Sequence, residues 1–280
     1  MGVKEMLRTR QRRRRMAMDA RAIAELADRL IAAEESRRPI EVPSLEYPGM
    51  TVADGYAVQR AIITTKVARG DRVIGKKVGL TSKANQDVFG VHEPVYGQLL
   101  ASGVHPEHTP VNTAQLIQPI IECEVTFVMR RRLAGPGVTV PDVIRATEGI
   151  MPSLELGDAR MRAWIGRARL PDIVADSCGN AGIIVGGELH ALHNFDLRYT
   201  GMVVEKNGEI LATGATGAVM GNPAQSVAWL TNKLAEIELA LEEGDLVLAG
   251  ALTGAVQMAA GDILTATFGG GLGAVGVKFV

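Results

Sequence analysis

Three carboxylates within otherwise apolar sequence constrain the fold of this chain more than any other feature. Glu122 and Glu124 lie in the apolar run 121–128, which predicts a buried strand, and Glu155 lies in a second apolar run. Side chains alternate along a strand, so Glu122 and Glu124 are expected on one face. A buried carboxylate is costly unless it is paired, protonated or bound to a cation. The pattern therefore predicts an interior site made of oxygen ligands.

These carboxylates are also compatible with two alternatives to a metal site. A Glu-x-Glu pair is common on an exposed strand face, where both side chains are solvated, but the apolar flanks and Glu155 weigh against it. A glycoside hydrolase also uses paired carboxylates, but it needs only two, and no aromatic residues for sugar stacking stand nearby. Three carboxylates together suit a hard divalent cation such as Mg²⁺, Mn²⁺ or Ca²⁺ better than a metal bound by thiolates.

The composition argues against several classes of protein. The chain has 280 residues, 47% of them hydrophobic, with a net charge of −1, so it has enough apolar sequence for a substantial core. The near-zero charge and the 4% aromatic content argue against a general nucleic-acid binder. Cys123 and Cys178 lack metal-binding spacing, and we expect reduced thiols in a cytoplasmic protein. No apolar run has membrane-spanning length, and no signal peptide is evident.

The predicted elements divide the chain into three parts. Residues 1–16 are expected to form a basic, mobile extension, because six arginines fall between positions 8 and 15; an arm that binds RNA or an acidic partner is the alternative. Residues 17–70 read as a helical region, with helices over 17–36 and from Thr51 to Gly70. Residues 71–280 read as a β-rich catalytic domain with few helices, which makes the fold class α+β.

Several local signals fall within the β-rich part. Asn207-Gly208 predicts a two-residue hairpin between strands, and Asn222-Pro223 predicts the start of a helix. Lys77 ends an apolar strand at a glycine, where a lysine near a carboxylate site can bind an anion or move a proton. Lys76 is expected at the surface, and Ser82 is expected either to cap a helix or to donate a hydroxyl to a site.

Four motifs, in this order, resemble one known family, and their combination is specific although no single motif is. They are Tyr-Pro-Gly-Met-Thr at 47–51, Gly-Lys-Lys-Val-Gly-Leu-Thr-Ser-Lys at 75–83, Glu-Cys-Glu at 122–124 and Pro-Ser-Leu-Glu-Leu-Gly-Asp-Ala-Arg at 152–160. From about residue 17 to residue 280 the chain resembles the 2-keto-4-pentenoate hydratase / 4-oxalocrotonate decarboxylase family, which has the fumarylacetoacetate-hydrolase fold.

The resemblance implies a fold and a chemistry. The fold would be a β-rich mixed β-roll or barrel with flanking helices and an N-terminal helical arm. Glu122, Glu124 and Glu155 would hold Mg²⁺ or Mn²⁺, and Lys77 would be the catalytic residue. The reaction would be that of a lyase on an unsaturated 2-oxo or 2-hydroxydienoic acid from aromatic meta-cleavage catabolism, through a metal-stabilised enolate. Family members often form homo-oligomers, and a decarboxylase can associate with a partner hydratase. The residues implied near the substrate are Leu80, Thr81, Ser82, Val95, Ser177, Asn180 and Thr253.

One position favours a decarboxylase over a hydratase. Hydratases of the family carry an acid in a Pro-Asp-Tyr/Phe-Gly motif, decarboxylases carry an aliphatic residue there, and this chain has Pro94-Val95-Tyr96-Gly97. Valine cannot move a proton or position water, and water exclusion suits decarboxylation. Ser177 stands where the family usually has Asn, and the segment around it favours hydratases of longer dioic acids. A hydratase of 2-keto-4-pentenoate or 2-oxohept-3-ene-1,7-dioate is therefore the alternative.

Two more remote functions are a hydrolase and a non-catalytic subunit. A hydrolase of carbon–carbon bonds uses the same fold and metal, but it generally needs a His–Glu pair in its N-terminal part, and the first histidine here is His92. A non-catalytic subunit of a mixed decarboxylase–hydratase assembly would fit Val95, which lacks the acid of the hydratases, and Ser177, which departs from the family pattern.

Overall fold

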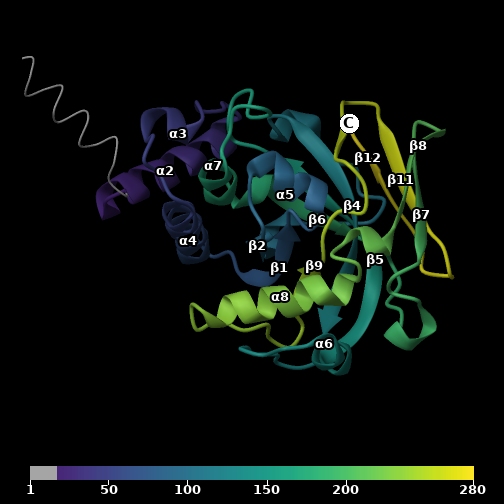
Figure 1. Cartoon of the computed structure of the whole chain (residues 1–280). Helices are drawn as coiled ribbons and strands as arrows, with labels where there is room; N and C mark the ends of the chain where they lie inside the picture. The colour runs from purple at the N-terminus through teal and green to yellow at the C-terminus, as the bar shows by residue number, and fades with distance from the viewer. Residues whose placement is uncertain (1–17) are drawn as a thin grey trace, which may run out of the picture. The chain divides into compact units, whose positions relative to one another are not determined.

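The computed structural model describes residues 18–280, which fall into two compact units (Figure 1). The first unit contains residues 18–70 and 159–179, and the second contains residues 71–158 and 180–280. The expected extension over 1–16 lies outside the described residues. The sequence predicted that 159–179 belong to the β-rich part, but α7 (Leu170–Ala175) packs against α4 (Val52–Ala68) in the helical unit.

The first unit is a small helical cluster with its own apolar core. The Thr51–Asp54 capping box predicted from the sequence is present at the start of α4, where Thr51 Oγ1 accepts from the Asp54 N–H. Leu26, Leu30 and Ile62 are buried together with Ala175, so the core joins segments far apart in the sequence. Its other helices are α2 (Ala20–Ser36) and α3 (Pro43–Glu46), followed after α7 by the turn η3 (Ser177–Gly179).

The second unit contains two sheets. The larger is an eight-stranded mixed sheet that forms a half-barrel, in the order β2-β1-β9-β4-β5-β6-β3 with β10 paired to β4; the smaller is antiparallel, in the order β12-β11-β7-β8. The smaller sheet contacts the larger through β12 and β5. The strands of the larger sheet are β1 (Val73–Gly79), β2 (Val95–Leu100), β3 (Val104–Pro106), β4 (Pro119–Met129), β5 (Thr147–Asp158), β6 (Asn180–Val185), β9 (Leu246–Leu248) and β10 (Val256–Gln257). Those of the smaller are β7 (Gly201–Lys206), β8 (Glu209–Ala215), β11 (Ile263–Phe268) and β12 (Gly273–Lys278).

Local signals in this unit are confirmed. Asn207 and Gly208 join β7 and β8 with φ values of 56° and 83°, as a tight hairpin turn requires. Asn222 caps α8 and Pro223 opens it. No helix among residues 18–280 is long and apolar enough to cross a membrane. The remaining helices are α5 (Lys83–Phe89), α6 (Val140–Ala146) and α8 (Pro223–Ala235), with short turns η1 (Ala101–Gly103), η2 (Thr113–Gln115), η4 (Leu192–Asn194) and η5 (Thr216–Ala218).

The pairing of β4 with β5 places the carboxylates. These two long strands run antiparallel, and their register sets Glu122 opposite Glu155 and Glu124 opposite Ser153. Strand β9 lies between β4 and β1, with Leu248 paired to both Thr126 and Lys77. The sheet therefore brings Lys77 to the same region as carboxylates that are remote from it in sequence.

Candidate metal centre

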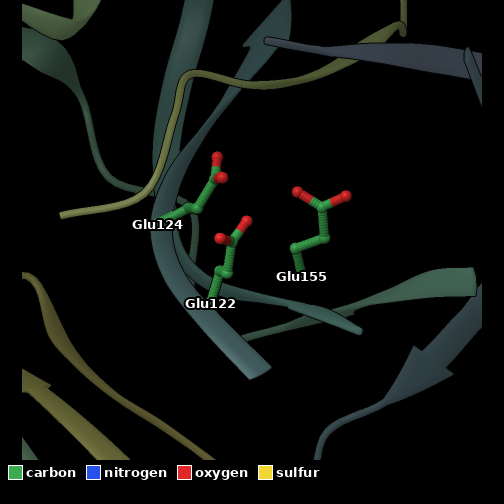
Figure 2. Close-up of side chains that lie close together, drawn as sticks. All are labelled: Glu122, Glu124 and Glu155. Carbon is green, nitrogen blue, oxygen red and sulfur yellow. The ribbon is translucent and has the colours of Figure 1, made fainter. Parts of the chain in front are cut away.

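Glu122, Glu124 and Glu155 form one cluster on the β4–β5 pair (Figure 2). One carboxylate oxygen from each lies within 4.8 Å of the others. Glu124 and Glu155 are only 1% and 2% exposed, and Glu122 is partly buried. The prediction that Glu122 and Glu124 share a face is confirmed, and the burial excludes the alternative of a solvated strand face.

The electrostatics of the cluster require a counter-charge. Like charges directly opposite on paired strands are unfavourable, and Glu122 faces Glu155 in this way. Burial raises the pKa of Glu122 to about 7, with a further increase from Glu155 and an opposing effect of Lys77. Burial and Glu155 also hold the pKa of Glu124 well above its ordinary value. The cluster therefore either holds protons or is balanced by positive charge beyond that of Lys77.

Three groups with N–H bonds surround the two buried carboxylates. The Gly250 N–H donates to Glu124 Oε2 at 2.7 Å, and Asn180 Nδ2 donates to Glu155 Oε1 at 2.9 Å. Lys77 is 2% exposed, and its Nζ forms an ion pair with Glu155 Oε2 at 3.1 Å. Among the described residues Glu155 Oε2 accepts no hydrogen bond, so this buried oxygen is held by its ion pair with Lys77.

These residues fit a divalent cation. All ligand atoms are carboxylate oxygens, which are the donors that Mg²⁺, Mn²⁺ and Ca²⁺ prefer. Glu155 Oε2 accepts no hydrogen bond and pairs with Lys77, so a bound cation would add a second positive charge beside it and would offset the repulsion between Glu122 and Glu155.

The surroundings of Lys77 are apolar on the β2 side. Val95 pairs with Gly79 across β1 and β2 and is 3% exposed. A Cβ at Gly79 would lie 3.2 Å from Val95 Cγ2 and 3.5 Å from Lys77 Nζ, so these two side chains face the same spot. The structure thus brings together two of the predicted site residues.

The expectation for Lys76 is wrong. Lys76 is 6% exposed, and its Nζ binds Asp245 Oδ2 at 2.7 Å. Alternation along β1 turns Lys76 away from Lys77, and the opposite face of this strand is also covered. Lysine is rarely buried, which predicts a surface position, but the partner Asp245 is 169 residues away in sequence.

The segment that follows Lys77 combines a buried residue with a helix cap. Thr81 is buried next to Gly250, since a Cβ at Gly250 would lie 2.4 Å from Thr81 Oγ1. Ser82 caps α5 by accepting from the Asn85 N–H, and the Leu80 carbonyl accepts from Gln86 Nε2. These bonds confirm the capping interpretation of Ser82.

Among the described residues, neither Thr253 nor Ser177 takes part in the contacts of the carboxylates and Lys77 given above. Thr253 is partly buried, and its methyl group would lie 3.0 Å from a Cβ added at Gly214. Ser177 belongs to the helical unit, at a φ of 53°, and its role in the site stays a prediction. Sequence reasoning gave no role to Gly250, because a glycine whose backbone N–H holds a carboxylate carries no side-chain signal.

Comparisons with known proteins agree with this geometry. Residues 69–280 match the family model "Fumarylacetoacetate (FAA) hydrolase C-terminal". The chain is 39% identical to the 2-oxo-hept-4-ene-1,7-dioate hydratase of Escherichia coli, over 91% of this chain and 97% of that protein. It is also 39% identical to the 4-oxalocrotonate decarboxylase of Pseudomonas sp. strain CF600, over 91% and 96%.

A solved structure extends the agreement to three dimensions. The 4-oxalocrotonate decarboxylase from Pseudomonas putida G7, complexed with magnesium and adipate, superposes with a TM-score of 0.91 at 37% identity, over 95% of this chain and all of that one. A divalent metal is therefore supported for this fold, together with the half-barrel architecture expected from the sequence. The chain belongs to the fumarylacetoacetate hydrolase family.

Proposed function

We propose that this protein is a divalent-metal-dependent lyase acting on an unsaturated 2-oxo acid from aromatic meta-cleavage catabolism. One observation carries the proposal: a buried lysine, Lys77, lies 3.1 Å from the carboxylate cluster of Glu122, Glu124 and Glu155. The candidate metal ligands thus lie beside a positively charged side chain that can bind an anionic substrate. The hydratase and decarboxylase relatives support the same class of reaction.

The residues of the site have separate roles in this proposal. The three glutamates hold the cation, with Mg²⁺ favoured and Mn²⁺ the alternative. When bound, such a cation supplies Lewis-acid stabilisation of negative charge at a 2-oxo group. Lys77 anchors the substrate carboxylate or delivers a proton from its Nζ. Because Lys77 is buried, its charge acts on the substrate with little screening by water.

Val95 favours decarboxylation within this class. It is buried beside Gly79 and faces the same spot as Lys77 Nζ, so the position on this side of the lysine carries no group that can activate water. An enolate formed by loss of CO₂ is then protonated and not hydrated. We therefore propose a decarboxylase of the 4-oxalocrotonate type.

A hydratase is the second candidate. The segment around Ser177 and Asn180 departs from both the decarboxylase and the hydratase pattern and favours hydratases of longer dioic acids. The relative from Escherichia coli is named a hydratase. Lys77 and the glutamates would serve both reactions, because both need a stabilised enolate and one delivered proton. The choice between them depends on how water is admitted.

Product analysis by NMR tests the proposal. Purified protein with Mg²⁺ receives 2-oxo-3-hexenedioate and, separately, 2-hydroxypenta-2,4-dienoate. We expect CO₂ release from the first and no water addition to the second. Formation of 4-hydroxy-2-oxopentanoate from the second would establish the hydratase instead. No turnover of either compound would contradict the 4-oxalocrotonate type and would favour a longer dioic substrate or a non-catalytic subunit.

Val95 can be tested directly. Val95→Asp should raise the proportion of hydrated product, because a carboxylate can position and deprotonate water. Val95→Ile is the matched control, since it keeps an apolar side chain, and it should leave the product ratio unchanged. An unchanged ratio in Val95→Asp would remove Val95 as the determinant of the reaction.

We further propose a homo-oligomer that associates with a partner hydratase, as the family resemblance implies. Light scattering of the purified protein, alone and mixed with such a hydratase, tests both parts. A monomer that forms no mixed species would contradict them.

A further inference from the structure

Each of the two buried carboxylates accepts a hydrogen bond from an amide N–H, and Glu155 also forms the ion pair with Lys77. Glu124 Oε2 accepts from the Gly250 backbone at 2.7 Å, and Glu155 Oε1 accepts from Asn180 Nδ2 at 2.9 Å. The donors come from different parts of the chain, the loop after β9 and the start of β6. Such bonds fix the rotation of a carboxylate about its last torsion, which is otherwise broad.

The backbone at Gly250 is shaped for this contact. Its φ is +130°, a conformation that residues with a side chain rarely adopt. A Cβ there would also lie 2.4 Å from Thr81 Oγ1 and 2.6 Å from Thr81 Cγ2. Any side chain at position 250 would collide with Thr81. Only glycine therefore allows the backbone N–H to reach Glu124 without moving Thr81.

Hydrogen bonds also hold the backbone of β4 at Glu124. Ser153 lies opposite Glu124 in the β4–β5 register, and its hydroxyl donates to the Glu124 carbonyl oxygen at 3.2 Å. Thr126 Oγ1 donates in turn to Ser153 Oγ at 2.7 Å, and both hydroxyls are fully buried. The backbone of this glutamate is therefore held by hydrogen bonds before any ligand binds.

Asn180 has a similar relation to Glu155. Its amide donates to Glu155 Oε1 and, at 3.3 Å, to the Gly182 carbonyl, which orients the side chain. The family resemblance placed Asn180 near the substrate, but these two contacts are to a metal-ligand candidate and to the backbone.

We propose that Gly250 and Asn180 are positioning residues that orient Glu124 and Glu155, so that each offers its remaining oxygen, Glu124 Oε1 and Glu155 Oε2, to the cation. The proposal rests on the metal-dependent function above. The buried Glu155 Oε2 accepts no hydrogen bond and has Lys77 as its ion-pair partner, so it keeps lone pairs for a cation. Loss of such supporting contacts typically weakens metal affinity by about 10- to 100-fold.

The test measures cation affinity without substrate. Mn²⁺ is titrated into metal-free protein, and the free ion is followed by electron paramagnetic resonance. Asn180→Leu removes the amide at similar volume, and we expect about 10- to 100-fold weaker binding. Asn232→Leu is the matched control, because Asn232 also bonds backbone groups, at Val138, but lies outside the site, and it should bind Mn²⁺ as the wild type does.

A second pair of variants tests Gly250. Gly250→Ala should weaken Mn²⁺ binding by a similar factor, whereas Gly254→Ala should not, because nothing lies within 4 Å of a Cβ at Gly254. If Gly250→Ala does not fold, the comparison of Asn180→Leu with Asn232→Leu still tests the proposal. Wild-type Mn²⁺ affinity in Asn180→Leu, with only a raised KM, would make Asn180 a substrate contact and overturn its positioning role.

These outcomes separate this inference from the proposed function. A wild-type protein that binds Mn²⁺ but turns over neither test substrate would contradict the proposed decarboxylase and leave the affinity comparison intact. A wild-type protein that binds no divalent cation would overturn both proposals.

Discussion

The ammonium group of Lys77 brings positive charge to the carboxylate cluster. The side chain is buried, and its position 3.1 Å from Glu155 Oε2 places the ammonium group next to any cation that the cluster binds. This arrangement repels a metal slightly and attracts an anionic substrate. Lys77 therefore belongs to the chemistry of the site more than to the retention of the metal.

The first prediction concerns the charge of Lys77. Lys77→Met should reduce kcat by about 10²- to 10⁴-fold, the usual contribution of a positioned acid or base. Mg²⁺ affinity should stay equal or rise, because a positive charge beside Glu155 is removed. Calorimetric titration and steady-state kinetics measure the two effects. Lys83→Met, at a side chain that is 70% exposed, is the control and should retain turnover. Near-normal kcat in Lys77→Met would contradict a catalytic role.

The second prediction concerns pH. Burial and Glu155 raise the pKa of Glu122 to about 7, and a ligand carboxylate must be ionised to bind a cation. Protons therefore compete with Mg²⁺ below this pH, and affinity should rise as pH increases from about 6 to about 8. Isothermal titration at fixed ionic strength measures it. Glu122→Gln should flatten this dependence, and a flat wild-type profile would speak against Glu122 as a ligand.

At the scale of elements, the pairing of β4 with β5 and of β1 with β9 and β2 builds the site. The opposite face of β1 carries a second buried ion pair, Lys76 with Asp245, which joins β1 to the turn before β9. Asp245 also accepts from the Glu242 N–H, so its carboxylate is well held. Lys76 and Lys77 thus form ion pairs on opposite faces of the same strand.

The third prediction tests this pair. Lys76→Met should destabilise the protein by about 3–5 kcal/mol, because Asp245 is left buried without its partner. The double variant Lys76→Met with Asp245→Asn should recover part of that loss. Urea unfolding gives both free energies. A single variant within about 1 kcal/mol of wild type would show that the ion pair contributes little.

At the scale of the whole molecule, all three ligand candidates belong to one compact unit. Glu122, Glu124 and Glu155 lie in the second unit, which also contains Lys77. Because the folded-state pKa of Glu122 is raised from 4.5 to about 7, the metal-free protein should lose stability as pH rises through this window. A bound cation removes this penalty.

The fourth prediction therefore joins metal and stability. Removal of divalent ions with EDTA should lower Tm, and Mg²⁺ at about 100 times its Kd should restore about 2.7 kcal/mol. The difference in Tm between the Mg²⁺-bound and metal-free protein should widen from about pH 5 to about pH 8. Addition of Mg²⁺ should slow hydrogen exchange most in β4 and β5. Differential scanning calorimetry measures the shift. Equal Tm values with and without Mg²⁺ at the upper end of this range would contradict a metal bound to the folded state.

Sequence reasoning predicted the local parts of this structure well, because their causes are local. The capping box at Thr51, the hairpin at Asn207 and the cap of α5 at Ser82 each depend on a few neighbouring residues. The shared face of Glu122 and Glu124 follows from strand alternation alone. By contrast, the assignment of Lys76 to the surface was wrong, because its partner Asp245 is remote in sequence.

The sequence by itself determined which carboxylates lie together, because a glutamate buried in an apolar strand is costly without a cation or a proton and because the motifs are specific to a family. Only the tertiary structure decided how the carboxylates are held. The β4–β5 register sets Glu122 against Glu155, and the approach of the Gly250 N–H and the Asn180 amide fixes one oxygen of each buried glutamate. These contacts join segments 25 to 126 residues apart, and no local pattern records which backbone N–H will meet which oxygen.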